Sequence, residues 1–381
     1  MAQLKMREKV RYFEARLEQM VESTRALVEI ESPSDNKAAL DGMAEYLAGK
    51  LQALGGRVQI HRSAQAGNSL QVDFPASGKP VLLLGHFDTV YPMGTLARMP
   101  CRNSGGKLTG PGVLDMKSGI VLMMAAIEGL RSLHGGLPRP VTVLLVSDEE
   151  VGSESSRHVT ESLAGKSAGV LVCEPSFGLR GAVKTARKGV GEYKIEVRGK
   201  AAHSGLDFQK GQNAIVELAG QIARIAKFVD LKRGLTLNPG LIAGGTRVNV
   251  VPAEASVSVD VRIARLRDAA GIDRKLRGLK PLNRKCKIEV SGGINRPPME
   301  RTPGVAGIYR KARGLAAEIE WKLEEAAVGG GSDGNFTAGL GIPTLDGLGG
   351  VGDGAHAVHE HILISELPRR AALLAGLIES I

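Results

Sequence analysis

Histidine and acidic residues follow three short apolar runs in the first half of the chain. The runs and the residues after them are 81–84 with His86 and Asp88, 141–146 with Glu149 and Glu150, and 169–172 with Glu174. Unbroken apolar runs of this length are typical of strands buried on both faces, as in the parallel sheet of an α/β domain. The carboxyl ends of such strands form the edge of the sheet where ligands bind. We therefore expect these side chains to meet in one site.

His86 and Asp88 suit a metal ligand and the partner that orients it. Residues two positions apart in an extended chain point to the same side, so the two side chains should lie close together. The carboxylate of Asp88 would accept the proton of one ring nitrogen of His86 and leave the other nitrogen facing a metal ion. A buried histidine bonded to a nearby carboxylate for purely structural reasons is the alternative interpretation.

Further candidate ligands come from two glycine-rich loops. Asp115 precedes an apolar helix expected at 120–133, and His356, His359 and His361 lie in a loop near the C-terminus. Four or five carboxylates in one small site would repel one another unless cations were present. A mixed set of histidines and carboxylates fits zinc better than calcium or magnesium, and the absence of cysteine from these positions favours a catalytic site.

The length and the hydrophobic pattern predict two domains. A chain of 381 residues is too long for one ordinary core. Residues 1–186 and 297–381 alternate between strands and helices, which is typical of an α/β domain. Residues 187–296 have the pattern strand, helix, two strands, helix and strand, which predicts an inserted α+β layer with an antiparallel sheet. Its strands are expected at 193–198, 246–251, 255–263 and 286–290.

Composition argues against several classes of function. The formal charge of +10 would suit nucleic acid, but the basic residues are scattered and aromatic residues make up only 3% of the chain, so we expect no nucleic-acid partner. No apolar run approaches the roughly 20 residues of a membrane helix, and the charged N-terminus does not resemble a signal peptide. Three widely spaced cysteines are typical of a reducing compartment. We expect a cytoplasmic protein without a membrane partner, whose positive charge attracts anionic small substrates.

Seven short motifs resemble those of one enzyme family: HFDTV, GPGVLDMKSG, SDEEVGS, CEPS, GKAAHSG, GGGSDGNF and GAHAVHE. In this order they resemble the aminoacylase/carboxypeptidase family of di-zinc metallopeptidases, and within it most closely the glutamate carboxypeptidases (carboxypeptidase G type). The resemblance implies a phosphorylase/hydrolase-like catalytic domain with a mixed central sheet, formed by 1–186 and 297–381. It also implies that 187–296 form an inserted ferredoxin-like dimerisation (lid) domain, and hence a homodimer.

The resemblance implies a metal centre with a general base. The implied ligands of two zinc ions, for which cobalt or manganese could substitute, are His86 and Glu174 for one ion, Glu150 and His356 for the other, and Asp115 between them. Glu149 resembles the general base, and Asp88 the partner of His86. Adjacent residues of an extended chain point in opposite directions, so Glu149 and Glu150 should not share one role. His359 stands where the family commonly has Asp or Asn, so His359 or His361 could be the ligand in place of His356.

The resemblance also implies substrate contacts. His203 resembles a histidine of the inserted domain that reaches a neighbouring subunit's active site and steadies the oxyanion. Asn249 and Arg262 match positions that hold the carboxylate and carbonyl of the substrate, although Arg262 could also be an ordinary solvent-facing arginine. The backbone N–H groups around Gly330 could support these contacts.

We therefore expect hydrolysis of an amide bond to an amino acid by a metal-bridging water, with Glu149 as general base. The first choice is an exopeptidase of the glutamate carboxypeptidase type that acts on an anionic peptide or N-acyl amino acid. The alternatives are an N-acyl-amino-acid deacylase of the acetylornithine or succinyl-diaminopimelate type and a non-catalytic peptide- or metabolite-binding relative. His61, His134 and His158 match none of the motifs and are expected on the surface.

Overall fold

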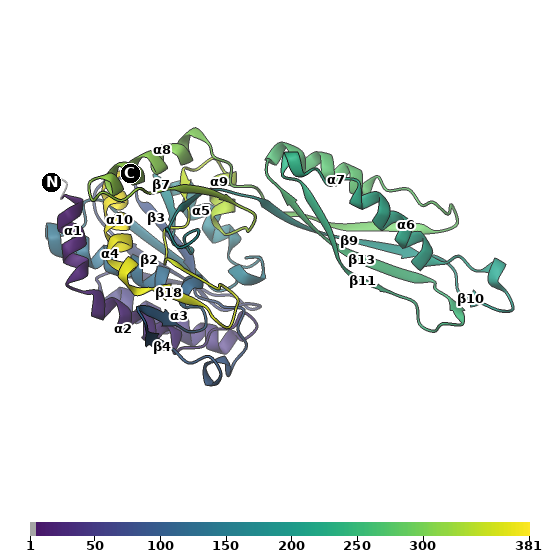
Figure 1. Cartoon of the computed structure of the whole chain (residues 1–381), viewed down its shortest axis with the longest axis horizontal. Coiled ribbons are helices and arrows are strands. Elements are labelled where there is room, and N and C mark those ends of the chain that lie inside the picture. The colour runs from purple at the N-terminus through teal and green to yellow at the C-terminus, as the bar shows by residue number, and fades with distance from the viewer. Residues whose placement is uncertain (1–4) are drawn as a thin grey trace. The chain divides into compact units, whose positions relative to one another are not determined.

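The computed structural model describes residues 5–381 and divides into two compact units (Figure 1). The first unit consists of Met1–Ala186, Arg301–Val328 and Ser332–Ile381. Its residues 1–4, where we place the start of the catalytic domain, lie outside the described part of the chain. The second unit consists of Arg187–Glu300 together with the three glycines Gly329–Gly331.

A six-stranded sheet forms the centre of the first unit. Its strands, in spatial order, are β1 (Arg57–His61), β2 (Ser69–Phe74), β6 (Val141–Val146), β3 (Val81–His86), β7 (Gly169–Val172) and β16 (Thr344–Leu345). Strand β3 runs parallel to both of its neighbours, whereas β2 runs antiparallel to β1 and β6. The sheet is therefore mixed, which confirms the fold class that the sequence predicts.

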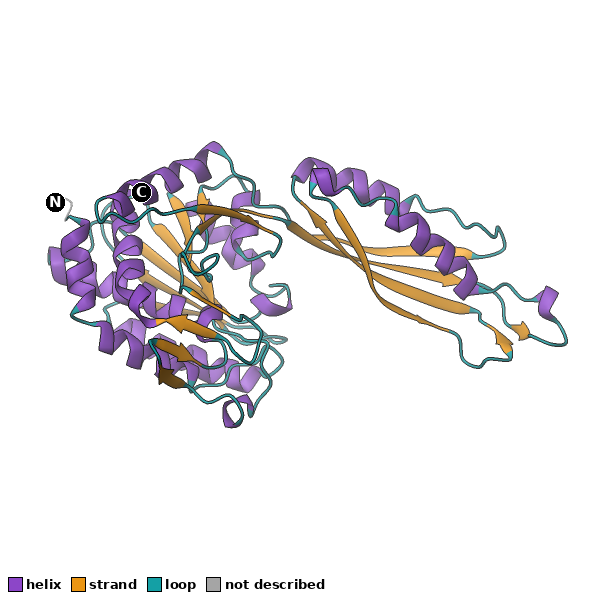
Figure 2. Ribbon diagram, in the orientation of Figure 1, coloured by secondary structure: helices purple, strands orange, loops and turns teal. Residues whose placement is uncertain are grey.

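Strand β3 is buried on both faces of the sheet. Successive side chains of the strand point to opposite faces, so each face contributes its own apolar contacts. Leu83 belongs to one apolar cluster with α4 (Ser118–His134) and α10 (Leu367–Ser380). Leu82 belongs to a second cluster with α5 (Arg157–Lys166). Figure 2 shows the helices of this unit around the sheet. This double cover explains why the central strands are continuous apolar runs in the sequence.

The remaining helices of the first unit are α1 (Met6–Glu14), α2 (Leu17–Val28), α3 (Lys37–Ala53), α8 (Pro303–Ala317) and α9 (Gly334–Gly339). Local sequence fixes where two of them begin. The side chain of Asn36 accepts the N–H of Ala39 at 3.1 Å to cap α3, and Thr302 caps α8 ahead of a proline in its first turn. Among residues 5–381, no helix is both long and apolar enough to span a membrane.

The expectation that His134 lies on the surface is wrong. Its imidazole is only 6% exposed, and Nε2 lies 2.5 Å from the carboxylate of Glu379 in α10. The same carboxylate lies 2.6 Å from the buried ammonium of Lys9 in α1. His158 is exposed as expected, whereas His61 is half-buried and bonds Gln71 at 2.9 Å.

A small antiparallel sheet carries the histidine-rich loop near the C-terminus. It joins, in order, β17 (Gly352–Asp353), β18 (His361–Leu363), β5 (Lys107–Thr109) and β4 (Arg102–Ser104). Because β18 pairs with β5, the loop before β18 lies beside the loop that follows β5, and Gly110 donates its N–H to the carbonyl of Glu360 at 3.4 Å. This pairing brings His356 and Asp115 to the same region. Strand β8 (Val183–Arg187) pairs with β15 (Glu325–Val328).

The second unit is a four-stranded antiparallel sheet with two helices on one face (Figure 2). Its strands, in spatial order, are β11 (Thr236–Gly244), β13 (Glu254–Ile263), β9 (Gly189–Arg198) and β14 (Lys287–Arg296), and its helices are α6 (Ala214–Ala226) and α7 (Ala269–Arg277). Alternate residues of β9 and β13 form its core with the apolar faces of both helices.

The predicted strand at 246–251 is wrong for most of its length. Only Val250–Val251 forms a strand, β12, which pairs with β10 (Ala202–His203). The sequence also does not predict β11, because Pro239, Gly240 and Gly244 are typical of turns. Strand β11 lies at the edge of its sheet and its register shifts between Pro239 and Leu241. An edge strand tolerates a proline, since no ladder hydrogen bond depends on the missing N–H.

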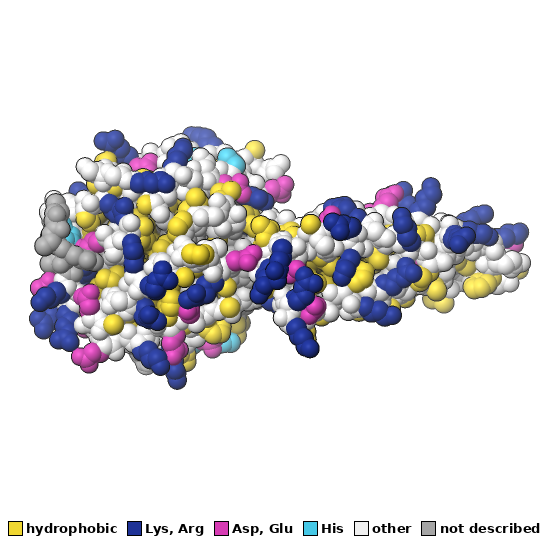
Figure 3. All heavy atoms as spheres, turned by 90° about the horizontal axis from the view of Figure 1, so that it is seen from above, with side chains coloured by type: hydrophobic (Ala, Val, Ile, Leu, Met, Phe, Trp, Pro, Cys, Tyr) yellow, Lys and Arg dark blue, Asp and Glu magenta, His cyan; other side chains and the backbone are white. Residues whose placement is uncertain are grey.

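The charge of the chain is unevenly divided between the two units. Residues 187–300 hold 22 of the 50 Lys and Arg residues but 11 of the 40 Asp and Glu residues, so the second unit carries +11 and the rest of the chain −1. Figure 3 shows more basic than acidic side chains on the visible face of the second unit. The positive field that we expect to attract anionic substrates therefore originates in the second unit.

Candidate metal centre

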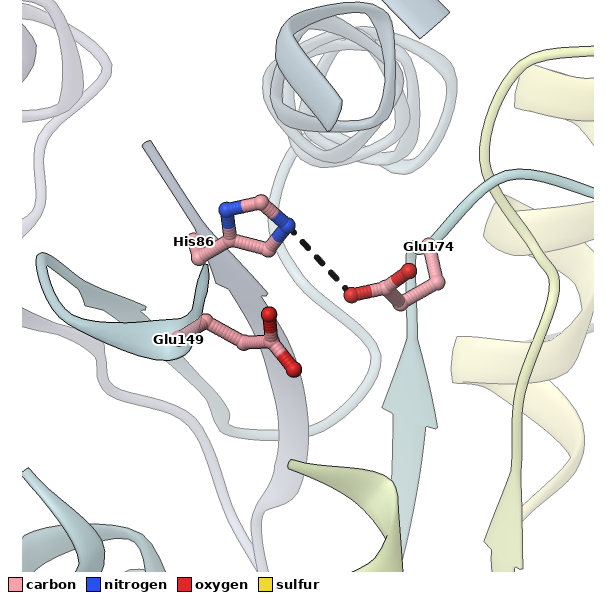
Figure 4. Close-up of side chains that lie close together, drawn as sticks. All are labelled: His86, Glu149 and Glu174. Carbon is pink, nitrogen blue, oxygen red and sulfur yellow. Dashed lines mark ion pairs between the residues drawn. The ribbon is translucent and has the colours of Figure 1, made fainter. Parts of the chain in front are cut away.

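The carboxyl ends of three adjacent parallel strands bring predicted ligands together. Strand β3 lies between β6 and β7, so His86, the residues after β6, and Glu174 after β7 meet at one edge of the sheet. Figure 4 shows the side chains of His86, Glu149 and Glu174 close together, with Nε2 of His86 3.4 Å from Oε1 of Glu174. One ligand atom from each of the three lies within 4.8 Å of the others.

Asp115 has one carboxylate oxygen near each of two histidines. Its Oδ1 lies 3.1 Å from Nε2 of His86, and its Oδ2 lies 3.5 Å from Nε2 of His356. Nε2 of His356 is also 3.0 Å from Oε1 of Glu150. The five side chains thus form two groups, His86 with Glu174 and His356 with Glu150, and Asp115 joins the groups.

The separations between these donor atoms fit two zinc-sized ions. Two ligand atoms at about 2.0–2.1 Å from a tetrahedral zinc ion lie roughly 3.3 Å apart. The four donor pairs described above lie 3.1, 3.4, 3.5 and 3.0 Å apart. His356 also has a positive φ of 64°, a costly conformation for a residue with a side chain that often occurs at functional sites. The donor set and its spacing therefore fit a pair of divalent ions that share Asp115.

The acids of the site favour the protonated forms of His86 and His356. Burial alone would lower the pKa of His86, but Asp115, Asp88 and Glu174 outweigh it and raise that pKa well above its usual value. Hydrogen bonds with Asp115 and Glu150 raise the pKa of His356 to about 10. Burial alone would raise the pKa of Asp115, but its hydrogen bonds with the two histidines lower it. Metal ions would therefore have to displace a proton from each ring.

The backbone carbonyl of Asp88 lies nearer to His86 than its carboxylate does, contrary to expectation. Nδ1 of His86 lies 3.0 Å from the backbone carbonyl oxygen of Asp88 and 3.4 Å from its carboxylate. The carboxylate accepts the N–H groups of Glu149 and Glu150, each at 3.2 Å, and the hydroxyl of Ser34 at 2.8 Å. The main chain of Asp88 thus orients His86, and its side chain holds the segment with the two acids.

The expectation that Glu149 and Glu150 lie in an extended chain is wrong. They begin a short 3₁₀ turn, Glu149–Val151, in which successive side chains are rotated by roughly 120°. A ligand atom of Glu149 groups with His86 and Glu174, and one of Glu150 groups with His86 and Asp115. The two acids therefore take different positions because of the turn.

His356 is the histidine of the C-terminal loop that contacts the other candidate ligands. His361 lies in β18, where its Nδ1 is 3.0 Å from the carbonyl oxygen of His359. The contacts of His356 with Glu150 and Asp115 match the ligand assignment that the family resemblance implies.

His203 and Asn249 lie together in the second unit. His203 pairs with Val250 across β10 and β12, and the next residue, Ser204, donates its N–H to the carbonyl of Asn249 at 3.0 Å. Nδ1 of His203 accepts the N–H groups of Gly205 and Leu206 at 3.1 and 3.2 Å. In the neutral ring the proton therefore sits on Nε2, which makes Nε2 a hydrogen-bond donor.

Arg262 lies toward the other end of β13 from this pair. Its guanidinium is held by Asp260, with Nε and Nη2 both at 2.9 Å from carboxylate oxygens. Strand β13 begins at Glu254, three residues after β12 ends, and Arg262 follows Glu254 by eight residues. At 3.3 Å per residue, this places Arg262 about 26 Å along the strand from the start of β13. One small substrate cannot contact Arg262 and the His203 pair of the same unit.

Gly330 also belongs to the second unit. Nη1 of Arg187 donates to the carbonyl of Gly330 at 3.2 Å and to that of Gly331 at 3.0 Å. The contacts that the structure gives Gly330 thus involve its carbonyl rather than its N–H.

Glu360 is a further residue of the site, for which the sequence predicts no role. It is fully buried, and its Oε1 accepts the N–H groups of Leu114 and Asp115 at 2.8 and 2.9 Å. Its Oε2 accepts the N–H of Gly112 at 2.9 Å and the hydroxyl of Tyr91 at 2.7 Å. Burial raises the pKa of Glu360, and these hydrogen bonds oppose that rise. Its place in the GAHAVHE motif is the sequence signal that could have identified it.

Comparisons with known proteins identify the family of the chain. Residues 82–380 match peptidase family M20/M25/M40. Carboxypeptidase G2 of Pseudomonas sp. (strain RS-16) is 30% identical over 368 residues, which cover 94% of this chain and 88% of that protein. A Mycobacterium tuberculosis protein named as a succinyl-diaminopimelate desuccinylase is 28% identical over 375 residues, 93% of this chain and 96% of its own.

A solved structure shares the fold. The YXEP protein of Bacillus subtilis, described as a dinuclear metal-binding peptidase of the M20 family, has a TM-score of 0.72 at 14% identity. The likeness covers 96% of this chain and 98% of that one. The match over residues 82–380 and the 30% identity to carboxypeptidase G2 show that the chain belongs to the M20/M25/M40 family of metallopeptidases.

Proposed function

We propose that the protein is a metal-dependent carboxypeptidase that hydrolyses the amide bond to a C-terminal glutamate. The observation that carries the proposal is the pair of His-and-carboxylate groups joined by the two oxygens of Asp115. The likeness to carboxypeptidase G2 over 94% of the chain supports exopeptidase activity. The motif resemblance to glutamate carboxypeptidases and the positive charge of the second unit support an anionic substrate.

The two groups support the following assignment of metal ligands. His86 and Glu174 would hold one ion, Glu150 and His356 the other, and Asp115 both. When bound, two zinc ions, or cobalt or manganese in their place, would lower the pKa of a water molecule and polarise the scissile carbonyl. The backbone carbonyl of Asp88 accepts the Nδ1 proton of His86 and so keeps Nε2 directed at the ligand cluster.

Glu149 would move the protons of the reaction. It lies close to His86 and Glu174, yet neither ligand group needs it. A carboxylate in this position takes a proton from the attacking water and returns it to the leaving amine. The hydrogen bonds from the N–H groups of Glu149 and Glu150 to Asp88 fix the turn, so that base and ligand keep separate places.

The second unit would bind the substrate. Nε2–H of His203 would donate to the developing oxyanion and Asn249 to the carbonyl, while the guanidinium that Asp260 orients in Arg262 would clamp the terminal carboxylate. The N–H groups around Gly330 would assist. Because Arg262 lies about 26 Å along β13 from Glu254, the end of the strand near the His203 pair, the two sets would come from different subunits of a homodimer.

An N-acyl-amino-acid deacylase is the second candidate function. The 28% identity to the Mycobacterium tuberculosis protein over 93% of the chain favours it. Such an enzyme would use the same ligands and the same base but bind a different acyl group.

A substrate panel with a base variant tests the proposal. Metal content and turnover are measured on Glu-terminated dipeptides and on N-acetyl and N-succinyl amino acids. We expect two metal ions per chain and preferred hydrolysis of the Glu-terminated amides. Glu149→Gln should lower kcat by about 10²–10⁴-fold while metal content stays unchanged, because only proton transfer is lost.

Each other outcome points to a different error. Activity on N-acyl amino acids alone would replace the carboxypeptidase by the deacylase. High activity in Glu149→Gln would refute the assignment of the base. A protein without metal or turnover would be a non-catalytic relative.

A further inference from the structure

One buried carboxylate joins three segments that carry proposed metal ligands. The four hydrogen bonds that Glu360 accepts are a full complement for a carboxylate. Three of them come from the loop of Asp115, and the fourth comes from Tyr91, five residues after His86. The hydroxyl of Tyr91 also lies 3.0 Å from the carbonyl of Ala357, the residue after His356.

The loop of Asp115 is shaped to fit this carboxylate. Gly112 has a φ of +71°, which residues with a side chain rarely adopt, and the turn it makes allows three N–H groups of residues 112–115 to converge on Glu360. A Cβ atom on Gly112 would lie only 2.6 Å from Cγ2 of Thr89, in the segment after His86. The loop is therefore held between Glu360 on one side and the His86 segment on the other.

We propose that Glu360 is the positioning residue of the metal centre, which fixes the main chain of Asp115 so that each carboxylate oxygen reaches a different metal ion. Its described contacts include the N–H of Asp115 but no side-chain atom of a proposed ligand. Because both ions share Asp115, a main-chain shift of about 0.5 Å would disturb both sites at once. This inference rests on the proposed metal centre.

A purely structural role for Glu360 predicts a different result, and Glu217 provides the matched control. Glu217 is a second buried carboxylate, 3% exposed, which accepts the N–H groups of Leu282 and Asn283 at 2.9 and 2.7 Å and the side-chain amide of Gln221 at 2.7 Å. It lies in the second unit, whereas all proposed metal ligands lie in the first. Loss of either carboxylate should destabilise the fold, but only loss of Glu360 should weaken metal binding.

The experiment compares Glu360→Gln, Tyr91→Phe and Glu217→Gln with the wild-type chain. Each protein is stripped of metal, checked by circular dichroism and thermal unfolding, and titrated with Co²⁺ and Zn²⁺ against a competing chelator. In Glu360→Gln an amide N–H₂ must face backbone N–H or hydroxyl donors, so both ions should bind about 10–100-fold more weakly, with an altered visible spectrum of Co²⁺. Tyr91→Phe should show a smaller loss, and Glu217→Gln should keep wild-type affinity.

Wild-type metal affinity and an unchanged Co²⁺ spectrum in folded Glu360→Gln would overturn the proposal. If Glu360→Gln does not fold, Tyr91→Phe decides: weakened metal binding in a stably folded protein supports the positioning role, and wild-type affinity contradicts it. Equal losses in Glu217→Gln and Glu360→Gln would show that the effect is structural. A wild-type chain that binds no metal would instead refute the proposed function.

Discussion

The two histidines of the candidate metal centre and the acids around them stabilise one another's charged forms. Asp115 and Glu150 raise the pKa of His356 to about 10. The same interaction that favours the protonated ring also makes a proton compete with the metal ion.

This competition predicts a pH dependence that differs between the metal-free and the metal-bound protein. A pKa raised in the folded state stabilises the fold fully below the unfolded value, about 6.5 for histidine, and the stabilisation is lost as pH rises through the folded value. With a chelator present, the urea midpoint should therefore fall as pH rises from about 6.5 toward the folded pKa of His356, about 10. With zinc present, metal binding should strengthen with pH over the same range. His356→Gln should make the urea midpoint in chelator less dependent on pH. A urea midpoint that rises with pH in chelator would contradict the stabilising role of protonated His356.

Asp88 shows at the same scale what residue spacing does and does not predict. The spacing of His86 and Asp88 predicts that they are neighbours, and they are. It does not predict that the backbone carbonyl, rather than the carboxylate, lies nearest to Nδ1, because that depends on how the loop after β3 bends. The carboxylate is engaged by N–H groups from residues 149 and 150, a contact between segments that no local pattern encodes.

Among the elements, the strands that carry the site are those that the sequence predicts best. β3, β6 and β7 are buried on both faces, so each is an unbroken apolar run with a clear end. Strand β11 has no such signal, because an exposed edge strand can contain a proline and glycines. The sequence also does not predict the turn Glu149–Val151, because two acidic residues and a valine after a strand fit a turn and an extended chain equally well.

The exposed side chains of β11 suggest how the proposed homodimer forms. Leu241 is 73% exposed and Ile242 is 65% exposed on this edge strand of the second unit. An open edge with large apolar side chains favours pairing with another strand. We expect the double variant Leu241→Lys/Ile242→Lys to shift the protein from dimer to monomer in sedimentation or light-scattering measurements.

The matched control is Leu266→Lys, which places a lysine at a residue of the same unit that is 50% exposed but lies outside the strands. This variant should remain dimeric. A β11 variant that keeps the wild-type mass would show that the subunits associate elsewhere.

At the scale of the whole molecule, the order of the motifs predicts more than local patterns do. It implies that residues as distant in sequence as His86 and His356 share a site, and the structure places both beside Asp115. The buried cluster of Lys9, His134 and Glu379 shows the limit of such reasoning. These residues match no motif, and only the packing of α1, α4 and α10 brings them together.

Mixed dimers test whether each active site needs two chains. A His203→Ala subunit lacks the oxyanion donor but keeps its base, and a Glu149→Ala subunit lacks the base but keeps its donor. If the donor acts across the interface, each mixed dimer contains one complete site, and an equimolar mixture should regain about a quarter of wild-type activity by random pairing. Activity no higher than that of the separate variants would place His203 and Glu149 of one chain in the same site.

The three glycines at 329–331 have a consequence for protein engineering. They group with the second unit although they lie far beyond its main segment, and Arg187 bonds the carbonyl groups of two of them. If only residues 187–300 were replaced by the matching segment of a related enzyme, the new segment would lack the backbone carbonyl groups of 330 and 331 that Arg187 binds. Chimeras with related enzymes should therefore exchange residues 187–300 and 329–331 together. A related enzyme with three glycines at the matching positions would be a compatible source of the second unit.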